Sequence, residues 1–217
     1  MAIILDNSGT NNPGGASSST WSFTNTAGNL IVVGVSAFDA TLANRTVSSV
    51  TYGGDAMTRI GTDADNSTSN GRTSLFYKLN PKTGANNVVV TMGGSCTNFA
   101  NYAASFTGIN TTDGNNNNTT VGGTSCDAAI TTTQANDLII DVMNGDAGPM
   151  SSGSSQNTIM DLNSSTGRGG YRVVTTAGAY SAKYTTAGND NYAVNSAAFS
   201  PSTATATYSA LMMMGVG

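Results

Sequence analysis

The chain has 217 residues and a formal net charge of −4, with eight Lys and Arg, twelve Asp, no Glu and no His. Charged residues make up 9% of it, against about 25% in an average soluble domain. The absence of histidine excludes Ser-His-Asp and Cys-His catalysis and zinc sites that contain histidine. The composition therefore predicts a protein that is not an enzyme and that works through its surface.

Short β-branched and aromatic runs separated by turn residues recur along the chain, whereas strong helix formers are scarce. The runs predict strands at residues 2–5, 18–23, 30–38, 47–52, 56–62, 73–79, 87–92, 99–106, 126–132, 137–143, 158–162, 170–175, 177–184, 192–199 and 204–210. Runs around Ile31, Val89 and Ile139 are apolar on both strand faces, so we expect them in the middle of a sandwich or under a covering loop. The pattern predicts an all-β protein, an antiparallel two-sheet sandwich that is jelly-roll-like.

No linker divides the chain, and we expect a single β-sandwich domain over residues 1–217. The terminal segments 1–16 and 201–217 are expected to extend for assembly contacts. Residues 62–72 and 109–123 are rich in Asn, Asp, Thr and Gly and are predicted to be long surface loops. The longest apolar stretch, residues 30–38, is about half the length of a membrane-spanning helix, so no membrane association is expected.

Oxygen-bearing side chains alternate at Asp63, Asp65 and Asn66, as they do in cation-binding loops. The Gly and the distal Glu of an EF-hand are missing. Two interpretations stay open, a structural calcium site and a loop whose side chains cap its own backbone, and the second is favoured. We therefore expect no cofactor, with structural calcium as the alternative.

One aspartate, Asp141, interrupts the apolar run 138–143. The favoured interpretation is an outward-facing residue at a strand edge, and the alternative is one member of a catalytic carboxylate pair. Trp21 shares a strand face with Phe23 and is expected in the core rather than as a sugar-binding platform. Cys96 and Cys126 either form one disulfide or are two buried thiols.

The two ends of the chain are the expected assembly contacts. Large apolar side chains near a terminus are more stable when covered, and a terminal segment can add a strand or an apolar plug to a neighbour. The expected contact residues are Met1, Ile3, Leu5, Leu211, Met212, Met213 and Met214. Residues 1–6 have no cationic and apolar regions typical of a secretion signal, which favours assembly in a host cytoplasm.

Four segments resemble a β-sandwich module of tailed-phage virion proteins and bacterial surface proteins: LIVVGVS at 30–36, VTYGGDAMTRIG at 50–61, LFYKLNPKTG at 75–84 and ASFTGI at 104–109. The resemblance covers about residues 28–145. It carries no catalytic residues, and it implies a part of a virion or of a cell surface.

These observations predict a virion structural protein, a capsid decoration (cement) protein that binds and stabilises a phage capsid. The expected partners are copies of the chain, with a trimer as the candidate form, and virion proteins such as the major capsid protein. The alternatives are a tail or fibre component, or a lectin-like or adhesin module that binds a glycan in an extracellular or cell-surface location. The lack of a basic cluster argues against nucleic acid as a partner.

Overall fold

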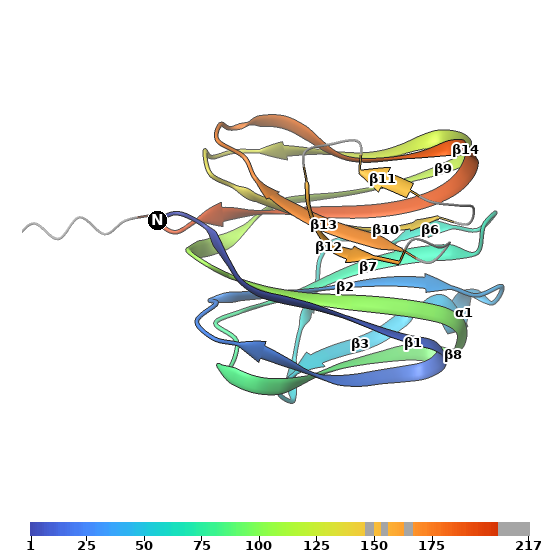
Figure 1. Ribbon diagram of the computed structural model, residues 1–217, viewed down its shortest axis with the longest axis horizontal. Helices are drawn as coiled ribbons and strands as arrows, with labels where there is room; N and C mark the ends of the chain where they lie inside the picture. The colour runs from blue at the N-terminus through green and yellow to red at the C-terminus, as the bar shows by residue number, and fades with distance from the viewer. Residues whose placement is uncertain (146–149, 153–155, 163–166, 204–217) are drawn as a thin grey trace, which may run out of the picture.

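The computed structural model describes residues 1–145, 150–152, 156–162 and 167–203. Its elements are β1 (Ile4–Asn25), β2 (Leu30–Phe38), α1 (Leu42–Arg45), β3 (Val47–Tyr52), β4 (Asp55–Ala56), β5 (Thr58–Arg59), β6 (Ala64–Asn66), β7 (Gly71–Leu79), β8 (Gly84–Thr107), β9 (Ile109–Thr132), β10 (Leu138–Gly145), β11 (Met150–Ser152), β12 (Asn157–Asp161), β13 (Arg168–Val173) and β14 (Gly178–Pro201). Strands β1 to β8 form one antiparallel sheet and β9 to β14 form the other, and the two sheets pack as a sandwich (Figure 1). The all-β prediction is confirmed.

The three apolar runs with two apolar faces all lie in strands that have a neighbour on each side. The run around Val89 belongs to β8 and pairs with β1 and β3. Strand β2 is hydrogen-bonded between β7 and β8, and β10 is hydrogen-bonded between β13 and β14. Both strands are buried on both faces along almost their whole length. Alternate residues of each strand therefore enter different cores, since successive side chains of a strand point to opposite faces.

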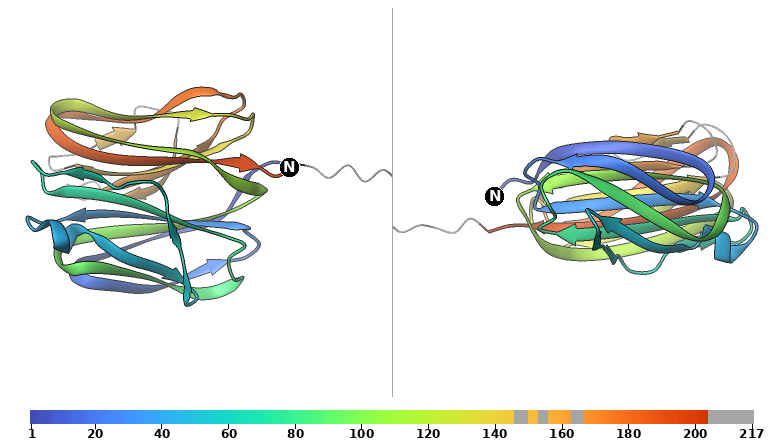
Figure 2. Two further views of the ribbon diagram at one scale, coloured as in Figure 1. Left: turned by 180° about the vertical axis from the view of Figure 1, so that it is seen from behind. Right: turned by 90° about the horizontal axis from the view of Figure 1, so that it is seen from below.

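The longest strands form two-stranded ribbons that fold over. Strands β1 and β8 pair from Ile4 with Thr107 to Asn25 with Gly84, and the register shifts repeatedly between Asn11 and Ser18. Strands β9 and β14 form a second ribbon with shifts around the same part of its length. These folded ribbons curl each sheet back on itself and give the molecule its jelly-roll-like form (Figure 2).

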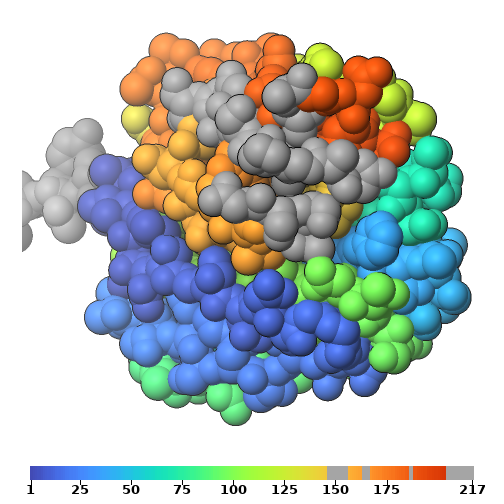
Figure 3. All heavy atoms as spheres, turned by 45° about the vertical axis from the view of Figure 1, so that its right-hand side comes forward, coloured from blue at the N-terminus to red at the C-terminus, as the bar shows by residue number. Residues whose placement is uncertain are grey.

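Corresponding glycines mark the two folds. Gly14 in β1 and Gly122 in β9 both have a positive φ, 67° and 64°, a conformation that favours glycine. The spacing from Gly14 to Gly122 is the same as that from Leu30 to Leu138, and these two leucines begin β2 and β10. Each half of the chain therefore begins with a ribbon strand that folds at a glycine and continues with a central strand at the same spacing. The first half forms the lower layers and the second half the upper layers (Figures 1 and 3).

One hydrophobic cluster contains residues of both sheets, among them Leu30 and Phe106 from the first and Ile140 and Phe199 from the second. Tyr102 of β8 belongs to it, and its hydroxyl donates to the main-chain carbonyl of Asp141 at 2.7 Å. Other clusters lie inside each folded ribbon. The sandwich thus has a core between its sheets and a separate core within each of them.

The prediction of a long loop at 109–123 is wrong, because these residues belong to β9 and pair with β14. Asparagines of the run also bond across the sheets, as Asn117 does by donating to the Thr62 hydroxyl at 2.8 Å. The predicted loop 62–72 contains the short strand β6, a turn and the start of β7. The strand predicted at 204–210 lies outside the described residues.

Trp21 packs against the core of the first ribbon, as expected, and its indole N–H donates to Asn101 Oδ1 at 2.7 Å. Cys96 and Cys126 are buried free thiols that belong to different clusters. Burial raises the pKa of both thiols, which makes them poor nucleophiles.

Candidate functional site

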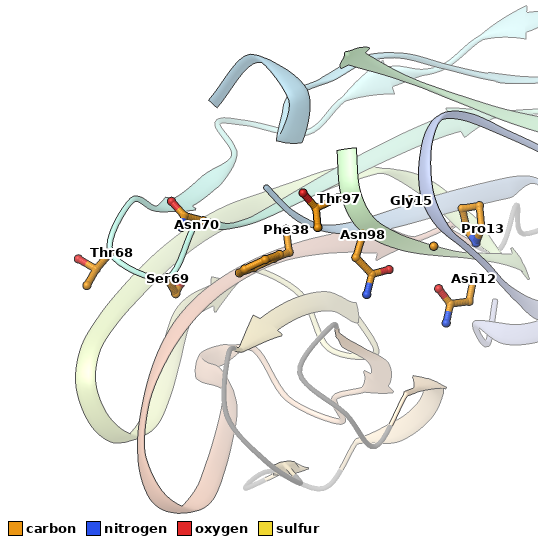
Figure 4. A pocket seen from close by; sticks show the side chains of 10 residues that line it. Asn12, Pro13, Gly15, Phe38, Thr68, Ser69, Asn70, Thr97 and Asn98 are labelled. Atoms are coloured by element: carbon orange, nitrogen blue, oxygen red, sulfur yellow. The ribbon is translucent and has the colours of Figure 1, made fainter. Parts of the chain in front are cut away.

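A cavity of about 810 Å³ opens at the end of the sandwich where the first ribbon folds. It lies between residues 12–15 of β1, Phe38 at the end of β2, the turn 68–70 before β7, and residues 97–98 of β8 (Figure 4). The amino terminus lies at the other end of the sandwich (Figure 1). The volume falls within the range of about 300–1,000 Å³ that is typical of small-molecule sites.

The fold in β1 forms one wall of the cavity. Pro13 has no backbone N–H to donate to a strand, and Gly14 has a φ of 67°. The neighbouring Gly15 approaches the other strand so closely that a Cβ atom there would lie 3.0 Å from the Thr97 carbonyl oxygen. The sequence Asn-Pro-Gly-Gly therefore bends the ribbon and brings it close to β8.

The turn between β6 and β7 forms the opposite wall. Asn66 Oδ1 accepts hydrogen bonds from the backbone N–H groups of Thr68 and Ser69 at 3.0 and 3.2 Å. Its amide donates to the carbonyls of Thr120 and Tyr192 at 2.8 and 3.0 Å. Asn66 thus holds the turn in shape and ties it to the second sheet.

A buried carboxylate, that of Asp39, holds Thr97, one of the residues that line the cavity. Asp39 Oδ2 accepts from the N–H and the hydroxyl of Thr97 at 2.8 and 2.7 Å, and Oδ1 accepts from Thr41 N–H and from the Asn44 amide. Burial alone would raise the pKa of Asp39, but these hydrogen bonds outweigh it and the pKa is lowered. Asp39 therefore stays ionised, and its oxygens face donors of its own chain.

The part of the cavity lining that the structure describes is mostly polar. Among the described residues that line it, none carries a charge. The half-buried ring of Phe38 supplies an apolar face, and Phe38 pairs in register with Asn98. Within the described part of the chain, Ser69 Oγ and Asn98 Oδ1 are buried without a hydrogen-bond partner. An unsatisfied buried polar atom costs about 1–3 kcal/mol, so these two atoms lower the stability of the fold around the cavity.

The predicted cation-binding residues do not converge on one point. Asp63 forms ion pairs with Arg59 and Arg72. Asp65 forms ion pairs with Arg45 and Arg72, with nitrogen–oxygen distances of 2.8 and 3.5 Å. Both carboxylates are thus neutralised by arginines, while the Asn66 side chain is hydrogen-bonded to the backbone of the turn. No group of three or more His, Cys, Asp or Glu that could hold a metal occurs within the described ranges.

The expectation that Asp141 faces outward is wrong. Its exposed fraction is 0%, because β10 is covered on both faces. Its carboxylate accepts hydrogen bonds from the Tyr184 hydroxyl and the Gln156 amide. Burial raises the pKa of Asp141 to about 7, against the opposing effects of the Tyr184 hydrogen bond and the Arg172 charge. A carboxyl so enclosed has no access to solvent in this conformation.

The amino-terminal contact residues divide between core and surface. Ile3 is buried and Leu5 packs against the same cluster, whereas Met1 is 69% exposed. Residues 211–214, the other predicted contacts, lie outside the described residues. The contact prediction for the amino terminus therefore rests on Met1 and the exposed side of β1.

Sequence reasoning missed the cavity residues Phe38, Ser69 and Asn98, which lie in separate parts of the chain. The one usable signal was the turn sequence at residues 12–15, which lies between the first two predicted strands. This turn sequence indicates where the ribbon folds, but it does not indicate which residues lie beside the fold.

No protein-family model matches the chain, and no curated protein sequence matches it. Within the described residues, no helix is long and apolar enough to cross a membrane.

Proposed function

We propose that the chain is a structural protein of a virus particle, a decoration protein that binds and stabilises a phage capsid. The observation that carries the proposal is the position of the two chain ends. The Met1 ammonium group donates to the Ser202 carbonyl, and the Ser202 N–H donates to the Gly108 carbonyl at 2.7 Å. Met1 and Thr203 therefore lie together at one end of the sandwich, and residues 204–217 continue the chain from there.

This end has apolar groups suited to a contact. Met1 and Ile4 are 69% and 61% exposed, and they border a cavity of about 540 Å³ that also touches Ala27 and Thr107. Exposed apolar side chains that gather on a surface are characteristic of protein–protein contacts. The apolar residues 211–214 follow in the same chain and supply further contact groups.

The charge distribution favours neutral interfaces. Within the described residues, most of the arginines and two of the lysines form ion pairs with aspartates. Contacts built on neutral hydrogen bonds and apolar burial are weakly screened by salt. Such contacts suit a particle that must stay assembled at different ionic strengths.

The proposed partners are further copies of the chain, in a trimer, and a major capsid protein. The resemblance of residues 28–145 to a β-sandwich module of tailed-phage virion proteins supports this assignment. A place in the tail or a fibre is the alternative that the experiment distinguishes.

The test compares the native mass of the full chain with that of the variant Leu211→Ser, Met212→Ser, Met213→Ser, Met214→Ser. We expect a trimer for the full chain and a monomer for the variant, because removal of the apolar side chains removes their burial. Val121→Ser is the matched control, since Val121 is 62% exposed in the fold of the other ribbon. It should leave the mass unchanged.

The second arm uses sedimentation with empty capsids and with isolated tails of the phage that encodes the chain. Cosedimentation with capsids supports the decoration role, and binding only to tails moves the assignment to a tail component. A full chain that is monomeric at every concentration and binds neither particle would overturn the proposal.

A further inference from the structure

The second cavity, of about 540 Å³, lies where the chain leaves the sandwich, and it is called the terminal cavity. Ser202 lines it together with Met1 and Ile4, and strand β14 ends beside the amino terminus (Figures 1 and 2). We infer that the terminal cavity takes up residues 211–214 of a second copy of the chain. This inference rests on the proposed function, and it names the contact through which copies assemble.

The walls of the terminal cavity are held by the backbone of the chain itself. Gly108 has a φ of 79°, and a Cβ atom there would lie 2.3 Å from the Ala2 carbonyl oxygen, so the glycine lets the amino-terminal segment approach closely. The Asp6 carboxylate accepts from the N–H groups of Thr26 and Ala27 at 2.9 and 3.1 Å. The cavity is therefore preformed, and little ordering is needed when it is filled.

Polar groups at the terminal cavity are engaged within the chain. The Asn29 amide donates to the Ile109 carbonyl at 2.6 Å, and Asn29 Oδ1 accepts from the Ile109 N–H at 3.1 Å. The Ser202 N–H donates to the Gly108 carbonyl. What remains open are the exposed apolar side chains of Met1 and Ile4. An occupant thus gains by burying apolar surface more than by forming hydrogen bonds.

Residues 211–214 have the chemistry that such a cavity accepts. They read Leu-Met-Met-Met and have no polar side chain. Methionine is unbranched and flexible, so it fills irregular apolar hollows better than branched residues do. Because residue 203 follows Ser202 directly, every copy that presents the cavity also presents the segment that fits it.

The spacer between Ser202 and Leu211 favours a second copy over the same chain as the partner. Residues 203–210 read TATATYSA and contain no Gly, Pro, Asn or Asp, which are the residues that most readily reverse a chain. The alternation of Thr with Ala predicts an extended segment, and the roughly nine residues from Ser202 to Leu211 span about 30 Å when extended.

An extended spacer carries residues 211–214 away from the cavity of their own chain and toward that of a neighbour. Each copy then gives one segment and takes up one segment. A head-to-tail contact of this kind closes into a ring when the rotation between copies allows it, and the proposed trimer is such a ring.

The test mixes two variants of the full chain. Ile4→Asp places a charge at the exposed rim of the cavity and keeps residues 211–214, whereas the serine variant of residues 211–214 keeps the cavity. Each variant alone should be a monomer, because each has lost one half of the contact. An equimolar mixture should form a heterodimer with twice the monomer mass, measured by native mass spectrometry, since one pairing of segment and cavity is intact in it.

Val121→Asp is the matched control for Ile4→Asp. Val121 is 62% exposed and Ile4 is 61% exposed, but Val121 lies beside the fold of the other ribbon. Val121→Asp should keep the trimer. The melting temperature of Ile4→Asp should match that of the Val121→Asp variant, which separates a loss of assembly from a loss of folding.

A synthetic peptide of residues 203–217 tests the cavity without assembly. Calorimetry should show that it binds the serine variant of residues 211–214. Adding Ile4→Asp to that variant should weaken binding at least about tenfold, the effect of losing one buried apolar side chain. The same peptide with serine at positions 211–214 is the control and should not bind.

Three results contradict the inference: Ile4→Asp stays a trimer, the mixture contains only monomers, or the peptide does not bind at millimolar concentration. The sedimentation arm keeps this test apart from the capsid proposal. If the mixture forms the heterodimer but the unaltered chain binds neither capsids nor tails, the capsid proposal alone fails. If Ile4→Asp stays a trimer and still cosediments with capsids, the contact between copies alone fails.

Discussion

Strands β2 and β10 occupy the same place in the two sheets. Leu30 of β2 lies between Phe106 and Leu79, and Leu138 of β10 lies between Phe199 and Val173. The runs Leu-Ile-Val-Val and Leu-Ile-Ile-Asp are both apolar over three residues and differ in polarity at the fourth, which is Val33 in one and Asp141 in the other.

The surroundings explain why the equivalent positions of the two sheets hold a valine in one and an aspartate in the other. Val33 lies in register between Phe76 and Ala103, in an apolar core. Asp141 lies between Gly170 and Ser196, and Tyr184 and Gln156 donate hydrogen bonds to its carboxylate. A central strand can therefore carry a carboxyl group where a neighbour is small and donors reach it from other elements.

The largest effect is expected for Val33→Asp, which places a carboxyl group where β2 has no described donors comparable to Tyr184 and Gln156. We expect it to lower the free energy of unfolding by at least about 4 kcal/mol, or to prevent folding. Urea denaturation measures the change. Val33→Ala, expected to cost about 2 kcal/mol through the cavity it leaves, is the control, and equal losses for the two variants would contradict the comparison.

The pH dependence of stability tests the other strand. The pKa of Asp141 is about 7 in the folded chain, against 3.8 for the unperturbed group, so the folded state binds more protons at intermediate pH. Its stabilising contribution is fully present below about pH 4, declines as the pH rises, and is gone above about pH 7. The difference of about 3 pKa units corresponds to on the order of 4 kcal/mol.

Urea denaturation between pH 4 and 8.5 measures this effect, and Asp141→Asn should remove most of it. Asp137 acts in the same direction, since burial and the neighbouring Asp113 raise its pKa to about 6. The lowered pKa of Asp113 acts in the opposite direction. If the variant and the unaltered chain show the same pH profile, Asp141 is not the group responsible.

A smaller effect is expected one residue further along, where β2 has Gly34 and β10 has Val142. A Cβ atom at Gly34 would lie 2.3 Å from the Tyr102 ring, and one at Gly169 of β13 would lie 2.4 Å from it. Gly34→Ala should cost about 1–3 kcal/mol because the ring must move. Combining it with Tyr102→Leu should give less than the sum of the single effects.

Thermal denaturation of the two single variants and the double variant measures this coupling. Gly188→Ala is the control, since no atom lies within 4 Å of a Cβ built there. Strict additivity of Gly34→Ala and Tyr102→Leu would show that the ring and the glycine do not share their space as described.

Local sequence predicted what depends on local chemistry. Runs of apolar residues predicted that β2 and β10 are covered on both faces, because only such a strand tolerates apolar side chains at every position. The pairing of Trp21 with Phe23 on one strand face identified a core contact. The same approach misplaced residues 109–123, because asparagine has a low strand propensity and the partner strand β14 lies far along the chain.

The sequence by itself determined the fold class and the absence of histidine and glutamate side chains, since both follow from which residue types are present. Only the tertiary structure decided where Asp141 lies and which residues surround the cavity. Phe38, Ser69 and Asn98 become neighbours because two ribbons fold and a turn is held against them. Such proximity depends on pairings between distant segments, which residue types and spacing do not specify.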